Sequence, residues 1–333
     1  MTPFTDLVDV AAERLGGAVL LANDEFFAPK ENLLKAAKPV WREGEYTDRG
    51  KWMDGWETRR RRTAGHDWCL VRLGVPALVR GVVVDTSWFR GNYPEACSLE
   101  ACAADGAADP ELLAAGRIEP WSEILPRSPL RGDGENPFPI SHPRRVTHLR
   151  FSIYPDGGVA RLRVYGEPAP DPRLRPGMEA DLGALEHGAM VVSCSDMFFG
   201  NRHQLIYPGH STHMGDGWET RRRRGPGHDW SIVRLAARGA ISRIEVDTDH
   251  FKGNAPESCR IEVADAPGAG PEALAAGSNG VRWTEILTRT PLQAHSRHRF
   301  EGLTASLVAT HARLSIYPDG GIARLRLFGR VVA

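Results

Sequence analysis

Short runs of alternating apolar and polar residues dominate the pattern of the chain. Alternate side chains of a strand share a face, so this period of two predicts strands with one buried side. The runs are rich in β-branched residues and are separated by Gly, Pro, Asp and Asn, which favours an antiparallel β-sandwich. The predicted strands lie at residues 68–73, 79–84, 98–101, 149–154 and 160–165, and again at 231–235, 241–246, 260–263, 312–317 and 323–328.

Helical periodicity is confined to a few short segments. Residues 110–115 and 271–276 predict short helical turns, because each segment begins with a proline and is followed by a glycine. Residues 5–15 predict a small N-terminal helix. The expected fold class is therefore all-β with few short helices.

One polar motif occurs twice. Residues 54–68 read DGWETRRRR-x-x-GHDW and recur at residues 216–230, with thirteen of fifteen positions identical. The duplication extends further, since residues 91–95 match 253–257 and residues 154–163 match 317–326. A core tolerates exchange among apolar residues of similar volume. A polar motif that is retained in both copies therefore indicates a site.

The period of the duplication is too long for a solenoid, whose units run about 20–50 residues, so two tandem domains are expected. Three prolines within residues 167–172 mark the joint, because proline favours an extended connector. We expect a first domain over residues 1–166, a Pro-rich linker over 167–176 and a second domain over 177–333.

Composition excludes several classes of protein. The 333 residues carry 42 basic and 42 acidic side chains, and acids flank each Arg run, so no surface for nucleic acid is expected. No apolar run approaches the ~20 residues that a membrane span needs, and no signal peptide is recognisable. The five cysteines include no C-x-x-C pair, which favours buried free thiols in a reducing compartment. We expect a cytoplasmic protein that binds neither nucleic acid nor membrane.

The duplicated motif combines an acid with several cations. If residues 57–62 form a strand, Glu57, Arg59 and Arg61 share one face, and Thr58, Arg60 and Arg62 lie on the other. The second copy repeats the first face with Glu219, Arg221 and Arg223. Arginine binds carboxylates bidentately, and the glutamate remains available for proton transfer. Neighbouring guanidinium groups would lower the pKa of Glu57 and favour a base over an acid. The alternative is a ladder of surface ion pairs, each of which contributes little.

Each copy also places a histidine next to an acid, at His66 and His228. Such a histidine is either a general acid–base group or a satisfied structural residue, and the sequence leaves both open. Neither copy shows a ligand spacing such as H-x-x-x-H or H-E-x-x-H. We therefore expect neither metal nor cofactor, because fixed arginine charge offers what a Lewis acid would.

Two further features of the duplication predict local structure. Residues 154–158 and 317–321 both read Tyr-Pro-Asp-Gly-Gly and predict hairpin turns, with glycine where φ becomes positive. The indoles of Trp56, Trp68, Trp218 and Trp230 are expected in the core or as anchors of loops.

These motifs carry a resemblance. Residues 24–34, 50–57, 91–95 and 214–219, together with the two Arg-rich motifs, resemble the allantoicase family over nearly the whole chain. The resemblance implies two tandem jelly-roll domains of the galactose-binding-like type. It also implies an oligomeric hydrolase of C–N bonds in linear amidines, which converts allantoate to ureidoglycolate and urea in purine breakdown.

The chemistry of allantoate, with one carboxylate and two ureido arms on a single carbon, assigns expected roles. Arg59, Arg61, Arg221 and Arg223 suit the carboxylate. Glu57 or Glu219 is the expected base, and His66 or His228 supplies the proton to the leaving nitrogen. The remaining substrate-binding candidates are Lys30, Asp54, Asn92, Asp216 and Asn254.

Two other functions remain open at this point. A pair of non-catalytic carbohydrate-binding modules is the first, since the same sandwich often binds sugars and fold does not fix function. Such modules usually expose aromatic platforms with few clustered arginines, unlike the Arg- and acid-rich segments here. The second is an assembly protein with two degenerate domains.

The sequence leaves open whether one or both copies hold a site. The offset between the copies falls from 172 at Asp24 to 162 at Asp54, so the first copy has a longer connection between Leu34 and Trp52. Trp88 corresponds to His250 in the second copy. One copy can therefore bind substrate while the other supports the fold or the oligomer.

Overall fold

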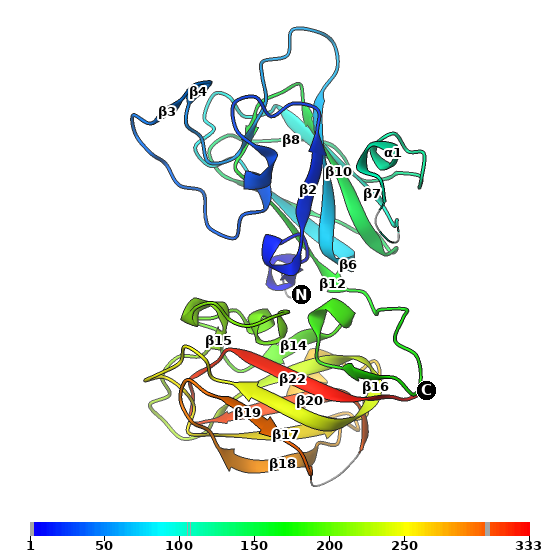
Figure 1. Cartoon of the computed structure of the whole chain (residues 1–333), viewed down its shortest axis with the longest axis vertical. Coiled ribbons are helices and arrows are strands. Elements are labelled where there is room, and N and C mark those ends of the chain that lie inside the picture. The colour runs from blue at the N-terminus through cyan, green and yellow to red at the C-terminus, as the bar shows by residue number, and fades with distance from the viewer. Residues whose placement is uncertain (1–2, 105, 107, 304–306) are drawn as a thin grey trace. The chain divides into compact units, whose positions relative to one another are not determined.

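The computed structural model describes residues 3–104, 106, 108–303 and 307–333. The chain divides into two compact units, Met1–Ala169 and Pro170–Ala333. Each unit is built from antiparallel strands with one short α-helix in its described part (Figure 1). The predicted all-β class, with two tandem antiparallel sandwiches and few helices, is confirmed.

The first unit contains twelve strands and α1 (Pro110–Ala114) among its described residues. The strands are β1 (Val8–Asp9), β2 (Ala18–Ala22), β3 (Tyr46–Thr47), β4 (Gly50–Lys51), β5 (Trp56–Glu57), β6 (Asp67–Asp85), β7 (Ala96–Cys102), β8 (Ser122–Pro129), β9 (Glu135–Pro139), β10 (Val146–Tyr154), β11 (Gly158–Val159) and β12 (Arg161–Pro168). The 3-10 helices are η1 (Phe4–Asp6), η2 (Glu13–Leu15) and η3 (Lys30–Leu34).

The second unit repeats this order without counterparts of β3 and β4. Its strands are β13 (Glu179–Asp181), β14 (Met190–Cys194), β15 (Trp218–Glu219), β16 (Asp229–Asp247), β17 (Ser258–Ala264), β18 (Thr284–Pro291), β19 (Arg297–Phe300), β20 (Val308–Tyr317), β21 (Gly321–Ile322) and β22 (Arg324–Val331). Its helices are η4 (Leu185–His187), η5 (Arg202–Ile206), η6 (Met214–Asp216) and α2 (Pro271–Ala276).

One long strand organises each unit. The first part of β6 pairs with β2 and β10, whereas its second part pairs with β12 and β9. The register shifts between Arg72 and Ala77, so the strand bends from one layer of the sandwich into the other. The sequence predicted two separate strands here, and the structure joins them; β16 does the same in the second unit.

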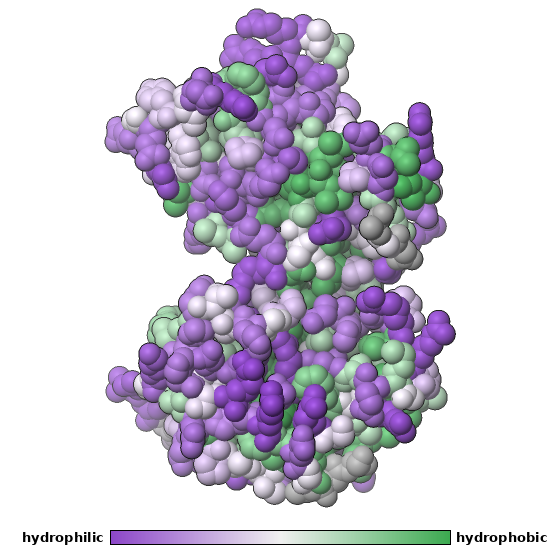
Figure 2. Space-filling model, viewed as in Figure 1, coloured by the Kyte–Doolittle hydropathy of each residue, from purple (hydrophilic) through white to green (hydrophobic). Residues whose placement is uncertain are grey.

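Apolar side chains of the two layers form each core. Trp56 and Trp218 are fully buried, and the Trp56 ring lies 6.2 Å from that of Phe151. Each indole nitrogen donates a 2.8 Å hydrogen bond to a loop carbonyl, at Asp24 and at Asp196. These two tryptophans therefore act as core residues that anchor loops, as expected, whereas Trp68 and Trp230 are half-buried and pack against smaller apolar clusters. Hydrophilic residues cover most of the visible face of each unit (Figure 2).

The N-terminal segment departs from the predicted helix over residues 5–15. It forms two 3-10 helices, η1 and η2, on either side of β1. Val8 pairs with Gly166 of β12, and the Val10 nitrogen donates to the Val164 carbonyl at 2.8 Å. Pairing with the sheet edge therefore overrides the local helical pattern.

The joint between the units begins later than the proline pattern suggested. β12 continues past Gly166 to Pro168, and the Ala169 nitrogen still donates to the Pro76 carbonyl. Residues 167 and 168 therefore belong to the sheet and not to a free connector. No helix of the described residues is long and apolar enough to cross a membrane.

Candidate active site

A small two-stranded sheet brings the polar motif to one end of the first sandwich. β5 pairs with β11, so that Glu57 lies opposite Gly158. The predicted turn at residues 154–158 precedes β11, and Gly157 has a φ of +134°. A Cβ atom on Gly157 would lie 2.7 Å from the Asn92 carbonyl oxygen, so glycine is required there. Gly158 donates to that same carbonyl at 2.7 Å, which fixes the Asn92 loop beside Glu57.

A cavity of about 930 Å³ lies over these elements. Its walls include Glu57, the run from Arg59 to Arg62, Asn92, Tyr93 and Asp156. Asn92 Nδ2 donates a 2.7 Å hydrogen bond to Glu57 Oε1. Of the predicted site residues, the structure thus brings Glu57, Arg59, Arg61 and Asn92 to one cavity.

The expected direction of the Glu57 pKa shift is wrong. Burial raises the pKa of Glu57 above its ordinary value, and the hydrogen bond from Asn92 offsets only part of that effect. The two arginines that were expected to lower this pKa, Arg59 and Arg61, are each paired with another acid, Asp24 and Asp67. A carboxyl group with a raised pKa can exchange a proton nearer neutral pH.

The arginines do not alternate on a strand as expected, because β5 ends at Glu57 and residues 58–62 are irregular. Arg59 pairs with Asp24, with Nη2 and Oδ2 2.6 Å apart, and Arg61 pairs with Asp67 at 2.6 Å. Within the described part of the chain, Arg60 and Arg62 have no such carboxylate partner. The cations available to a ligand are therefore Arg60 and Arg62, which the sequence analysis assigned to the other face.

Asp54 and Asp216 form buried ion pairs that stabilise the fold. Each is buried and pairs with a buried arginine, Asp54 with Arg161 at 2.8 Å and Asp216 with Arg324 at 3.0 Å. Asp54 Oδ2 also accepts a hydrogen bond from the Val40 nitrogen. Asp54 is not among the residues that line the cavity over Glu57.

Lys30 lies in a neighbouring hollow. Its ammonium group pairs with Glu31 at 2.8 Å and with Glu25 at 3.1 Å. This second cavity, of about 420 Å³, shares Phe26 and Phe27 with the first one. The structure thus places Lys30 next to the Glu57 cavity but does not direct it into that cavity.

The histidines of the motif pack against tyrosine. The His66 ring centroid lies 4.7 Å from that of Tyr154, and His228 lies 4.6 Å from Tyr317. Burial lowers the pKa of His66, and the charges of Arg61 and Arg150 lower it further. His66 is not among the residues that line the described cavity. The structure therefore favours the structural alternative for this pair.

The second unit repeats the polar contacts. Asn254 Nδ2 donates to Glu219 Oε1 at 2.6 Å, Arg221 pairs with Asp196, and Arg223 pairs with Asp229. Asn254 also contacts the Met214 sulfur at 3.3 Å, a contact that the first unit cannot make because Trp52 stands at that position. The two glutamates therefore have different neighbours.

Several residues of the cavity were not predicted from the sequence. Arg60 and Arg62 were visible but were assigned to a strand face that does not exist. Asp156 belongs to a segment that was predicted only as a turn, and Tyr93 belongs to the loop at residues 91–95; the contact between these two loops brings both residues to the cavity. Among the described residues, no group of three or more His, Cys, Asp or Glu side chains is arranged to hold a metal ion.

Comparison with known proteins supplies the family. The allantoicase repeat matches residues 8–169 and 180–332. A probable allantoicase of Pseudomonas aeruginosa is 49% identical over 330 residues, which covers 98% of this chain and 97% of that protein. A probable allantoicase of Nocardia farcinica is 50% identical over 329 residues, with coverage of 98% and 95%.

A solved structure agrees with this similarity. The crystal structure of allantoicase from Saccharomyces cerevisiae superposes with a TM-score of 0.79 at 33% identity, and the match covers 97% of this chain and 92% of that one. The family match over both repeats and the relatives of about half identity over nearly the full length lead to one conclusion. The chain belongs to the allantoicase family.

Proposed function

We propose that this allantoicase-family chain hydrolyses allantoate to ureidoglycolate and urea in the cavity over Glu57. The observation that carries the proposal is a half-buried carboxyl group with a raised pKa beside Arg60 and Arg62, which pair with no carboxylate in the part of the chain that the structure describes. Family membership supports an enzyme over a pair of sugar-binding modules. The clustered cations suit an anionic substrate.

Glu57 acts as the proton carrier of this reaction. Its carboxylate takes a proton from water while the water oxygen bonds to the central carbon of allantoate. The bond from that carbon to one ureido nitrogen breaks, and Glu57 returns the proton to this nitrogen as urea leaves. One carboxyl group can serve both steps because its raised pKa brings its acid and base forms closer in energy near neutral pH.

Arg60 and Arg62 bind the substrate carboxylate, and Asn92 holds Glu57. A guanidinium group offers two parallel N–H donors to a carboxylate, which fixes orientation as well as charge. Asn92 donates to one oxygen of Glu57 and so leaves the other oxygen for water or for the leaving nitrogen. The reacting carbon is thereby positioned between cation and acid–base group.

The remaining expectations belong to the same proposal. The protein is a cytoplasmic homo-oligomer that binds neither nucleic acid nor membrane. Balanced charge, with 42 basic and 42 acidic residues, supports the first exclusion. Four of the five free cysteines are buried, and burial raises the pKa of Cys97 to about 12, which suits persistent thiols in a reducing compartment.

Urea release from purified protein tests the proposal. Urea and ureidoglycolate should appear in equal amounts when allantoate is supplied. A protein that releases neither product over a range of pH values and with added divalent metals would contradict the enzymatic function.

A further inference from the structure

The first unit carries an additional segment between Pro39 and Met53. Pro39 corresponds to Ser211 and Met53 to Gly215, so ten residues are extra in the first unit. The segment contains the small ribbon of β3 and β4, which projects from one side of the unit (Figure 1). Asp54 accepts a hydrogen bond from the Val40 nitrogen at 3.0 Å and so attaches the start of the segment to the sandwich.

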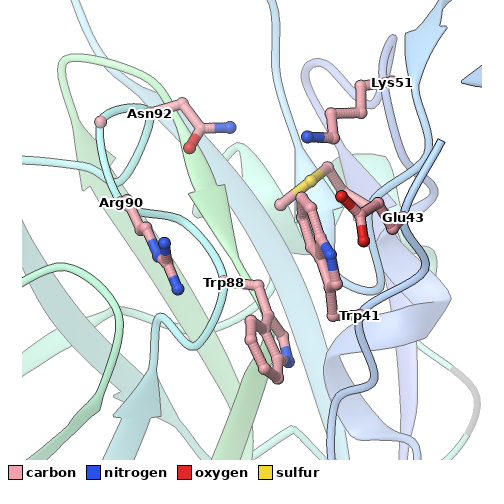
Figure 3. Close-up of a pocket in the computed structure, with 8 residues that line it drawn as sticks. Trp41, Glu43, Lys51, Trp88, Arg90 and Asn92 are labelled. Carbon is pink, nitrogen blue, oxygen red and sulfur yellow. The ribbon is translucent and has the colours of Figure 1, made fainter.

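This segment builds one wall of a third cavity, of about 530 Å³. Trp41, Glu43 and Lys51 come from the segment, and Trp88, Arg90 and Asn92 face them from the loop after β6 (Figure 3). Trp41 stacks on Trp88 with centroids 5.9 Å apart, and Trp88 Nε1 donates to the Pro39 carbonyl. We call this cavity the insertion cleft.

The insertion cleft adjoins the Glu57 cavity. Gly91 and Asn92 line both, and the Asn92 amide donates to Glu57. A small molecule with its reacting carbon beside Glu57 can therefore extend past Asn92 into the cleft.

The polar groups of the cleft remain available to a ligand. Within the described residues, neither Glu43 nor Lys51 forms an ion pair. The Lys51 ammonium group is held 4.1 Å over the Trp41 ring, and the two stacked indoles offer flat apolar surface. Arg90 is already engaged by Asp133 at 3.0 Å. The cleft thus combines one free carboxylate, one free ammonium group and planar walls.

The second unit replaces this cleft with direct contacts. His250 occupies the place of Trp88, and its Nε2 contacts the Ser211 carbonyl at 3.1 Å. Met214 contacts Asn254 beside Glu219. The second unit lacks counterparts of Trp41 and Glu43 within the ten extra residues, and His213 stands in place of Lys51.

We propose that the insertion cleft binds one ureido arm of allantoate and that the first unit therefore holds the productive active site. A ureido group is planar, has N–H donors that the Glu43 carboxylate accepts, and has a carbonyl oxygen to which Lys51 donates. Its flat face packs on indole. This inference rests on the proposed function, since it names the part of allantoate that the cleft receives.

Steady-state kinetics of the full-length protein tests the inference. The informative variants are Glu43→Gln and Lys51→Met, with Glu45→Gln as the matched control. Glu45 belongs to the same segment but pairs with Arg42 and does not line the cleft. We expect the two cleft variants to raise KM for allantoate about 10- to 100-fold, as the loss of a hydrogen bond to a charged group does, with little change in kcat. The control should keep the wild-type KM.

Product inhibition provides a second measurement. Urea should inhibit the wild-type protein competitively, and its inhibition constant should rise in both cleft variants. If wild-type protein hydrolyses allantoate but both variants match Glu45→Gln in KM and in urea inhibition, the cleft assignment is overturned while the proposed function stands. If wild-type protein releases no urea from allantoate, the proposed function and the cleft assignment fail together. Thermal melting separates a folding defect from a binding defect in either variant.

Discussion

Asn92 donates a 2.7 Å hydrogen bond from Nδ2 to Glu57 Oε1, and this pair links the loop after β6 to β5. Asn254 and Glu219 repeat it at 2.6 Å in the second unit. Hydrogen bonding to an ionised carboxyl group favours the charged form, whereas burial opposes it. For Glu57 burial is the larger effect, so its pKa is raised.

The pH profile of kcat/KM should report this balance. As a base, Glu57 must be ionised, so activity falls as the pH decreases through its raised pKa. Asn92→Ala removes the hydrogen bond that lowers the pKa, and the acid limb should therefore move to higher pH. Asn254→Ala is the control and should leave the limb in place. A limb that stays unmoved in Asn92→Ala would show that another group titrates.

Glu57→Gln should lower kcat by ~10²–10⁴ with substrate binding retained, because the variant keeps the shape of the side chain but cannot carry a proton. Glu219→Gln is the matched variant in the second unit and should stay close to wild type. Single-turnover and steady-state rates of both variants decide the point. Equal losses in the two variants would assign catalysis to both units.

Arg60→Ala and Arg62→Ala should each raise KM about 10-fold or more, since each removes a cation that no carboxylate of the described residues engages. Arg59→Ala should have a smaller effect on KM, because Arg59 is 2.6 Å from Asp24. Initial rates over a range of allantoate concentrations measure all three. If Arg59→Ala raised KM more than the other two variants, Arg59 would bind the substrate carboxylate, as strand periodicity predicted.

Most of the fold follows from sequence because alternation, turn residues and duplication all describe local structure. The strands near residues 98–101 and 149–154 correspond to β7 and β10, and Pro110 begins α1 as predicted. The prediction of an N-terminal helix was wrong because β12 offers pairing partners that local propensity cannot reveal. The single strand β6 was read as two because a bend resembles a break in the pattern.

The candidate site was predicted only in part, for a related reason. Glu57 lies in the Arg-rich motif and Asn92 in the loop at residues 91–95, and both segments are retained in the second copy. The structure joins the two side chains by a hydrogen bond. The state of a charged side chain depends on its partner, and the partners of Arg59 and Arg61 lie at Asp24 and Asp67. The extra length before Met53 was visible, yet only the folded structure shows that it lines a cleft.

Asp54→Asn should destabilise the first unit and not merely weaken substrate binding. Asp54 and Arg161 are both buried, and their ion pair is 2.8 Å long. Removal of one partner leaves a buried charge uncompensated, which costs about 3–5 kcal/mol of the free energy of unfolding. Asp216→Asn should do the same to the second unit through Arg324. Glu45→Gln, at an exposed pair, should leave the melting temperature nearly unchanged.

Chelation should leave activity intact. The prediction is motivated by the excess of fixed positive charge around Glu57, where Arg60 and Arg62 supply the stabilisation of negative charge that a Lewis acid would otherwise offer. Protein dialysed exhaustively against a chelator, with its metal content measured, should release urea from allantoate at the untreated rate. Activity that is lost on chelation and restored by one stoichiometric divalent ion would contradict this prediction. In that case the acids of the cavity, Glu57 and Asp156 among them, would be the first candidates for ligands.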